Sequence, residues 1–199
     1  MREIIGDSPD RTVVLLCEQD DLHATWSRFG PGRDGADLHI HHHHADHFYV
    51  LSGELTLRLG PDGREVSMAE GTFARIPAGV VHGFRNASDA EVTYLNLHAP
   101  GMGFADFLRD LRDGRPAAYD QHDPPPDGGR PVSEASIGQP EGGVAVVVAE
   151  PGVAVSGRLY VLAGELATAG GVRAEAGEWV ELDAPDTLAA PARLLSVAL

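Results

Sequence analysis

The fold is decided by residues 71–86, which read GTFARIPAGVVHGFRN. Pro77 presets its own backbone φ and Gly79 tolerates positive φ, so this pair predicts a turn between two extended segments. The turn delivers His82 and Phe84 onto one face of the following strand, because side chains two residues apart in a strand point the same way. The stretch therefore sets a histidine and an aromatic ring side by side.

Outward from this stretch, residues 1 to about 100 consist of short apolar runs broken by Gly, Pro, Asp and Asn. The run 55–59 alternates apolar and polar residues, which is typical of a half-buried strand, and the turn sequence 60–63 follows it. Other strand-like runs cover residues 11–16, 48–51 and 92–97. Many short strands at regular spacing predict an all-β sandwich or barrel.

Six of the ten histidines lie between residues 39 and 47. Side chains alternate faces in an extended strand. This alternation predicts that His39, His41 and His43 point to one side of the strand and that His42 and His44 point to the other. Two imidazoles on one face, two residues apart, are well placed to share a metal ion, so the run predicts a metal site.

Asp46 and His82 complete the candidate ligand set. If a strand begins at Asp46, then Asp46, Phe48 and Val50 share its interior face and His47 faces away. Three imidazoles and one carboxylate suit a divalent ion of iron, nickel, copper, manganese or cobalt, with zinc as a further candidate. The alternative interpretation is a solvated histidine-rich strand that binds metal adventitiously.

These two regions resemble the two sequence motifs of the cupin superfamily. Residues 71–86 fit the second motif, G-x5-P-x-G-x2-H-x3-N, at every fixed position, and residues 35–53 resemble the first, G-x5-H-x-H-x3–4-E-x6-G. Asp46 stands where the first motif has glutamate, and only three residues separate Gly35 from the first histidine. The resemblance implies a double-stranded β-helix (jelly-roll) fold that holds a metal through four side chains, His39, His41, Asp46 and His82.

The aspartate leaves the ligand set open, because its side chain is one methylene shorter than that of glutamate. Asp46 could bind the metal directly, through water, or not at all, which would leave a three-histidine site. His43 and His47 are alternative ligands, although strand parity disfavours His47.

A different pattern follows the first hundred residues. Residues 104–113 predict an amphipathic helix that ends at Gly114, with apolar side chains at i, i+3, i+4 and i+7: Phe104, Phe107, Leu108 and Leu111. The Pro- and Gly-rich run 123–129 predicts an extended connector.

The strand pattern returns near the C-terminus as an internal repeat. Residues 159–166 match residues 48–55 at six of eight positions, and residues 177–182 have a counterpart in 71–76. The ligand positions of the first copy correspond there to Glu150, Gly152, Gly157 and Leu188, which cannot form an equivalent site. We therefore predict a metal-binding cupin barrel (1–100), a helix and connector (101–140) and a degenerate cupin-like β unit without metal ligands (141–199).

The order of these elements is similar to that of bacterial quercetin 2,3-dioxygenase-like cupins. That resemblance implies a metal-dependent dioxygenase acting on a small aromatic or enol-type molecule, with Asp46 as the general base. The interior residues Phe48, Val50 and Phe84 are expected to wall the substrate pocket. Two alternatives stay open: a non-redox metal-dependent isomerase or cyclase, and a small-molecule-binding cupin without turnover.

Composition excludes several other classes. Acidic residues outnumber basic ones 30 to 15, for a net charge of -15, which argues against nucleic acid and against an anionic membrane surface as partners. The absence of lysine excludes Schiff-base and P-loop chemistry, and the single cysteine, Cys17, excludes a Cys-based zinc cluster. We expect a cytoplasmic protein that forms a homodimer through strand edges and binds a small-molecule substrate.

Overall fold

The computed structural model describes residues 2–199, and the chain divides into two compact units, Met1–Gln139 and Pro140–Leu199. Strands dominate both units, which confirms the all-β prediction. Among the described residues, no helix is long and apolar enough to cross a membrane.

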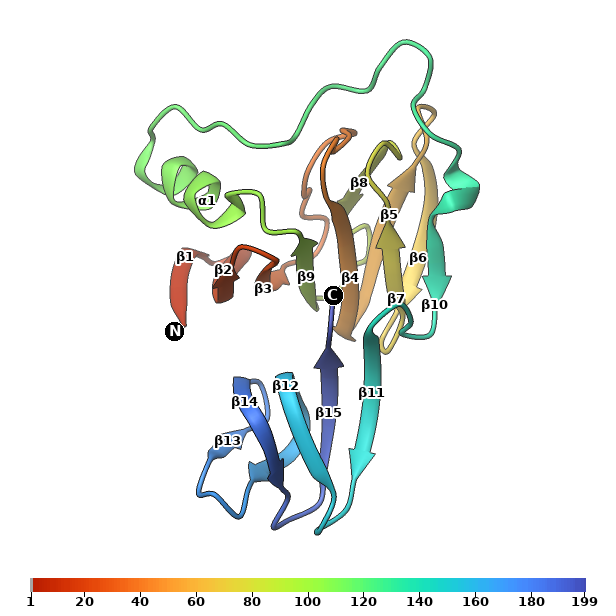
Figure 1. The fold of residues 1–199 in the computed structure, drawn as a ribbon. Helices are drawn as coiled ribbons and strands as arrows, with labels where there is room; N and C mark the ends of the chain where they lie inside the picture. Colours follow the sequence, from red (N-terminus) through yellow and green to blue (C-terminus); the bar gives the residue numbers. More distant parts are fainter. Residues whose placement is uncertain (1) are drawn as a thin grey trace. The chain divides into compact units, whose positions relative to one another are not determined.

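A seven-stranded antiparallel sheet forms one layer of the first unit (Figure 1), in the order β1-β2-β3-β9-β4-β7-β10. Its strands are β1 (Glu3–Ser8), β2 (Arg11–Gln19), β3 (Leu22–Phe29), β9 (Val92–Ala99), β4 (Ala45–Ser52), β7 (Phe73–Ile76) and β10 (Ser136–Gly138). The strands predicted at 11–16, 48–51 and 92–97 are thus confirmed as the cores of β2, β4 and β9.

A three-stranded sheet forms the other layer, in the order β6-β5-β8. Its strands are β5 (Glu54–Leu59), β6 (Arg64–Ala69) and β8 (His82–Arg85). Apolar side chains from both sheets meet in one core, which includes Phe48 and Val50 from β4 and Leu55, Leu57 and Leu59 from β5. The two layers make the double-stranded β-helix that the sequence predicts.

Gly53 lets the chain pass from one sheet to the other between β4 and β5. Its φ is 76°, and a Cβ atom there would lie 2.4 Å from the carbonyl oxygen of Glu91. Only glycine adopts this conformation without strain and leaves room for that carbonyl. The crossing sets the strands that follow onto the opposite face of the core.

The predicted helix is confirmed as α1 (Phe104–Asp113), and it ends at Gly114 in the left-handed conformation, with φ 66°. Beyond it, residues 115–131 contain neither helix nor strand, as the connector prediction requires. This segment crosses the first unit (Figure 1) and is pinned to it by two β-bridges, Ile40 with His122 and Val80 with Gly129. A short 3₁₀ turn, Val132–Glu134, leads into β10.

The second unit contains β11 (Val144–Ala149), β12 (Ala154–Ala167), β13 (Arg173–Glu175), β14 (Trp179–Thr187) and β15 (Ala192–Val197). These strands pair in the order β11-β15-β12-β13, with β14 also paired to β12. They enclose a separate apolar core that includes Val161, Leu166 and Leu194.

The internal repeat is confirmed by matching backbone hydrogen bonds. In the first unit, Gly71 N–H donates to Val50 O at 2.9 Å and Val50 N–H donates to Thr72 O at 3.0 Å. In the second unit, Gly177 N–H donates to Val161 O at 2.8 Å and Val161 N–H donates to Glu178 O at 2.9 Å. The repeated sequence therefore builds the same strand-turn pairing twice.

Replacement of Phe48 by alanine is expected to destabilise the first unit by about 3–5 kcal/mol, because it leaves a cavity in a fully buried core. Urea unfolding followed by circular dichroism measures this loss. Ile4→Ala is the matched control, since the Ile4 side chain is 59% exposed and its truncation should cost little. Equal losses in the two variants would contradict the assigned core.

Candidate metal centre

The two sequence motifs meet through a backbone bridge between His39 and His82. His39 N–H donates to His82 O at 2.8 Å, and His82 N–H donates to His39 O at 2.9 Å. The bridge brings the four predicted ligands together: one ligand atom from each of His39, His41, Asp46 and His82 lies within 4.8 Å of every other. All four side chains are buried.

Backbone carbonyls orient all three histidines of this cluster. His39 Nδ1–H donates to Asp37 O at 2.6 Å, and His82 Nδ1–H donates to Val80 O at 3.0 Å. His41 Nδ1–H donates to Asp120 O. Because a carbonyl oxygen only accepts, each ring carries its proton on Nδ1 and presents the Nε2 lone pair to the centre.

Asp46 reaches this centre despite its short side chain. Its Oδ1 lies 3.4 Å from His41 Nε2, and its Oδ2 lies 3.5 Å from His82 Nε2. Among the described residues, Asp46 Oδ1 and His82 Nε2 are buried without a hydrogen-bond partner. Unpaired buried acceptors are costly, and a cation between them would satisfy both. The set of three nitrogens and one oxygen therefore fits a first-row transition ion.

Electrostatics favour the ligand-competent protonation states at His39 and Asp46. Burial, reinforced by the neighbouring His82 and His41, lowers the pKa of His39 to about 3. Burial alone would raise the pKa of Asp46, but His98 and His41 lower it well below its ordinary value. Burial would lower the pKa of His41, and the Asp46 carboxylate reverses that shift and raises it. At neutral pH the centre therefore holds a neutral His39 beside an ionised Asp46.

Asp120, in the connector, is a structural partner that sequence reasoning missed. Its carboxylate accepts hydrogen bonds from the backbone N–H groups of His42 at 3.0 Å and His43 at 2.7 Å. It also accepts one from His44 Nδ1–H at 3.0 Å. A contact between positions so far apart in the chain leaves no local sequence signal, because only the crossing of the connector creates it.

The prediction that side chains alternate between two faces along the histidine run is wrong for His43 and His44. Residues 42 and 43 form a bend, not a strand, because Asp120 binds both of their N–H groups. The bend exposes His42 and His43 and turns His44 inward. His43 therefore lies outside the ligand cluster. His47 is buried away from the cluster, with Nδ1 3.3 Å from Leu97 O.

His98 extends the cluster on the other side of Asp46. It lies directly opposite Asp46 in the pairing of β4 with β9, and its Nδ1 is 2.9 Å from Asp46 Oδ1. Asn96 Nδ2–H donates to His47 O, which leaves its Oδ1 to accept from His98 Nε2–H at 2.9 Å. His98 therefore turns its Nδ1 lone pair toward Asp46; strand register could have pointed to this residue.

Tyr119, also in the connector, closes this side of the cluster. Its hydroxyl lies 2.7 Å from His44 Nε2 and 2.8 Å from His98 Nδ1. Burial, together with the Asp46 and Asp120 carboxylates, raises the pKa of Tyr119, so the hydroxyl keeps its proton. It can donate that proton to either histidine, which makes a short hydrogen-bonded chain next to Asp46.

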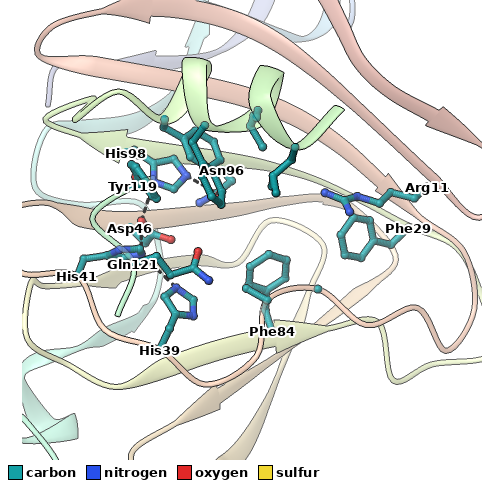
Figure 2. Close-up of a pocket in the computed structure, with 16 residues that line it drawn as sticks. Arg11, Phe29, His39, His41, Asp46, Phe84, Asn96, His98, Tyr119 and Gln121 are labelled. Carbon is teal, nitrogen blue, oxygen red and sulfur yellow. Dashed lines mark hydrogen bonds and ion pairs between the residues drawn. The ribbon is translucent and has the colours of Figure 1, made fainter. Parts of the chain in front are cut away.

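A cavity of about 220 Å³ opens beside the cluster (Figure 2). Its walls combine cluster side chains with the apolar face of α1 and with rings from β3 and β8, and they include His39, His41, Asp46, His98, Phe29, Phe84, Phe104, Phe107, Leu108 and Tyr119. Of the three residues expected to wall a substrate pocket, Phe84 lines this cavity. Phe48 and Val50 are fully buried in the core between the two sheets and do not line the cavity.

Comparison with known proteins finds a family match for the part of the chain that carries the four candidate ligands. Residues 25–98 match the family model of the cupin domain. Over 113 residues the chain is 33% identical to quercetin 2,3-dioxygenase from Bacillus subtilis (strain 168). The aligned region covers 56% of this chain and 32% of that enzyme. The chain thus spans about a third of that relative.

Solved structures share the fold over almost the whole chain. GK1651 from Geobacillus kaustophilus superposes with a TM-score of 0.60 at 19% identity, covering 98% of this chain and 91% of that one. The pirin YhhW from Escherichia coli, in complex with nickel(II), superposes with a TM-score of 0.63 at 12% identity, covering 98% and 93%. At these identities the likeness concerns the fold alone.

Asp120→Asn is expected to weaken metal binding about tenfold to a hundredfold, because the amide cannot accept all the hydrogen bonds that shape the histidine bend. Competition titration with a chelator measures the affinity. Asp123→Asn, at an exposed position of the same segment, is the control and should bind metal like the unmodified protein. Unchanged affinity in Asp120→Asn would show that the bend forms without this carboxylate.

Stability of chelator-treated protein is expected to fall as the pH drops from 6.5 to 4. Burial lowers the pKa of His47 to about 4, so over this range the unfolded chain binds a proton that the folded chain does not. The His47 contribution is on the order of 3 kcal/mol, fully present above pH 6.5 and lost toward pH 4. Urea midpoints at several pH values should therefore fall less steeply in His47→Gln, whereas exposed His43→Gln keeps the original slope. Equal slopes in all three proteins would rule out this contribution.

Proposed function

We propose that this chain, whose residues 25–98 match the family model of the cupin domain, is a metal-dependent oxygenase that acts on a small aromatic or enol-type molecule. One observation carries the proposal: a buried cluster of imidazole nitrogens and one carboxylate forms part of the wall of a cavity that is otherwise lined mainly by aromatic and apolar residues. Such a cavity suits a flat organic molecule whose polar end reaches the cluster.

His39, His41 and His82 would hold the ion through Nε2, with Asp46 supplying the fourth ligand atom. When bound, a first-row transition ion supplies Lewis acidity and one-electron redox capacity. The carbonyl contacts at Nδ1 hold the three rings in place, so the protein needs little reorganisation to receive the ion.

Asp46 would act as the general base. It lines the cavity, and a carboxylate that gives one oxygen to the ion keeps a second oxygen that can accept the proton of a substrate hydroxyl. His98 Nδ1, 2.9 Å away, can take the proton on, and the Tyr119 hydroxyl lies next in line at 2.8 Å. These three groups move the proton away from the reacting end of the substrate.

The apolar wall of the cavity positions the rest of the molecule. Phe104 and Phe107 from α1 face Tyr119, with ring centroids 5.2 and 5.1 Å from it, and Phe84 lies on another wall. Aromatic walls favour a flat ring and keep bulk water from the reacting group. The likeness to quercetin 2,3-dioxygenase, an enzyme named for an aromatic substrate, supports this class of reaction.

His82→Ala is expected to abolish stoichiometric metal binding, because it removes one of the converging nitrogens. Metal content is measured by mass spectrometry on untagged protein purified without added metal. About one equivalent of iron, nickel, copper, manganese or cobalt is expected in the unmodified protein and in the exposed control His43→Ala. A variable excess that His82→Ala leaves unchanged would show adventitious binding and overturn the proposed centre.

Oxygen consumption by metal-loaded protein then tests the reaction class, with a panel of phenols, enols and 1,3-diketones. Uptake of oxygen with loss of substrate supports the oxygenase. Product formation without oxygen would assign the protein to metal-dependent isomerases or cyclases instead. Stabilisation by a ligand that remains chemically unchanged would identify a binding protein.

A further inference from the structure

One charged residue of the cavity, Arg11, has no role in the proposed reaction. Among the described residues that line the cavity, Arg11, at the start of β2, is the one arginine, and Asp46 of the cluster is the one carboxylate. Within residues 2–199 its guanidinium makes neither an ion pair nor a hydrogen bond. Neighbouring arginines behave differently, since Arg28 pairs with Glu91 and Arg33 pairs with Asp10, both at 3.0 Å.

Burial distinguishes Arg11 from other arginines without a carboxylate partner, since Arg64, Arg75 and Arg193 are exposed to water. Arg11 is half-buried, so part of its hydration is already lost and no counter-ion replaces it. The net charge of -15 disfavours anionic ligands in general, and Arg11 supplies a local exception inside the cavity.

The aromatic wall connects Arg11 to the cluster. The guanidinium carbon lies 5.7 Å from the centre of the Phe29 ring, and Phe29 stacks with Phe84 at 6.1 Å. Figure 2 shows Arg11 and Phe29 toward one side of the cavity, His39 and His41 toward the other, and Phe84 between them. The cation–π contact holds the guanidinium at the end of this wall.

We propose that the cavity takes a small aromatic substrate that bears a carboxylate, and that Arg11 binds this carboxylate at the end remote from the cluster. The planar guanidinium matches a carboxylate with two parallel hydrogen bonds, and stacking along Phe29 and Phe84 aligns the ring between them. A cavity of about 220 Å³ accommodates a single substituted ring of this kind. The inference rests on the proposed function only for the reaction at the cluster, at the other end of the substrate.

Two probes of equal shape test the proposal: 4-hydroxybenzoate, which carries the charge, and its neutral isostere 4-hydroxybenzamide. Isothermal titration calorimetry on metal-loaded protein is expected to show at least tenfold tighter binding of the carboxylate. Arg11→Gln should remove this preference, and Arg11→Lys should retain part of it because the charge is kept. Arg75→Gln is the matched control: Arg75 is exposed in the same unit and does not line the cavity.

Several results would overturn the proposal. These are equal binding of the two probes to the unmodified protein, no binding of either at millimolar concentration, or a preference that survives in Arg11→Gln. A preference that survives there but disappears in His82→Ala would mean that the cluster, not Arg11, binds the carboxylate. If the preference depends on Arg11 and no substrate supports oxygen uptake, the anion subsite stands and the proposed oxygenase falls, so the two failures are distinguishable.

Discussion

A buried carboxylate imposes the main constraint on this structure. Asp46 lies at the centre of the first unit with 2% of its surface exposed, and an ionised carboxylate without partners would be strongly destabilising there. Imidazoles from three separate parts of the chain surround it: His41 and His44 on either side of the bend, His82 from β8 and His98 from β9. Because these rings turn lone pairs toward Asp46, a cation bound among them would compensate the charge of the carboxylate.

The connector acts as part of the site and not only as a link. Tyr119 and Asp120 contribute a hydroxyl, a carboxylate and a backbone carbonyl to groups around Asp46. Because Asp120 shapes the bend at residues 42–43, the ligand geometry depends on a segment that has no regular secondary structure. Together with α1, the connector also gives the cavity a wall that the two sheets alone do not provide.

Comparison of the two units shows that the residues that determine the fold are not the residues that form the site. Both keep the glycine that begins the returning segment, Gly71 with φ 81° and Gly177 with φ 90°, and both keep the apolar residues of the paired strands. The glycine and the apolar residues determine the backbone path and the burial that strand pairing needs. The ligand side chains determine neither of these, so the second copy keeps the same strand pairing although Glu150 and Gly152 replace the two histidines.

The amino-acid sequence by itself determined the cores of β2, β4, β5 and β9, the helix, and the candidate set His39, His41, Asp46 and His82, because alternation, helical spacing and motif spacing are local properties of the chain. Tertiary structure alone decided that His44 turns inward, that His98 faces Asp46, and that Tyr119, Asp120 and Arg11 reach the site. These placements follow from strand register and from the path of the connector, which depend on contacts between residues far apart in the sequence. The same reason explains Phe48 and Val50: their interior orientation was readable from parity, but which interior surface opens into a cavity depends on how the second sheet packs over them.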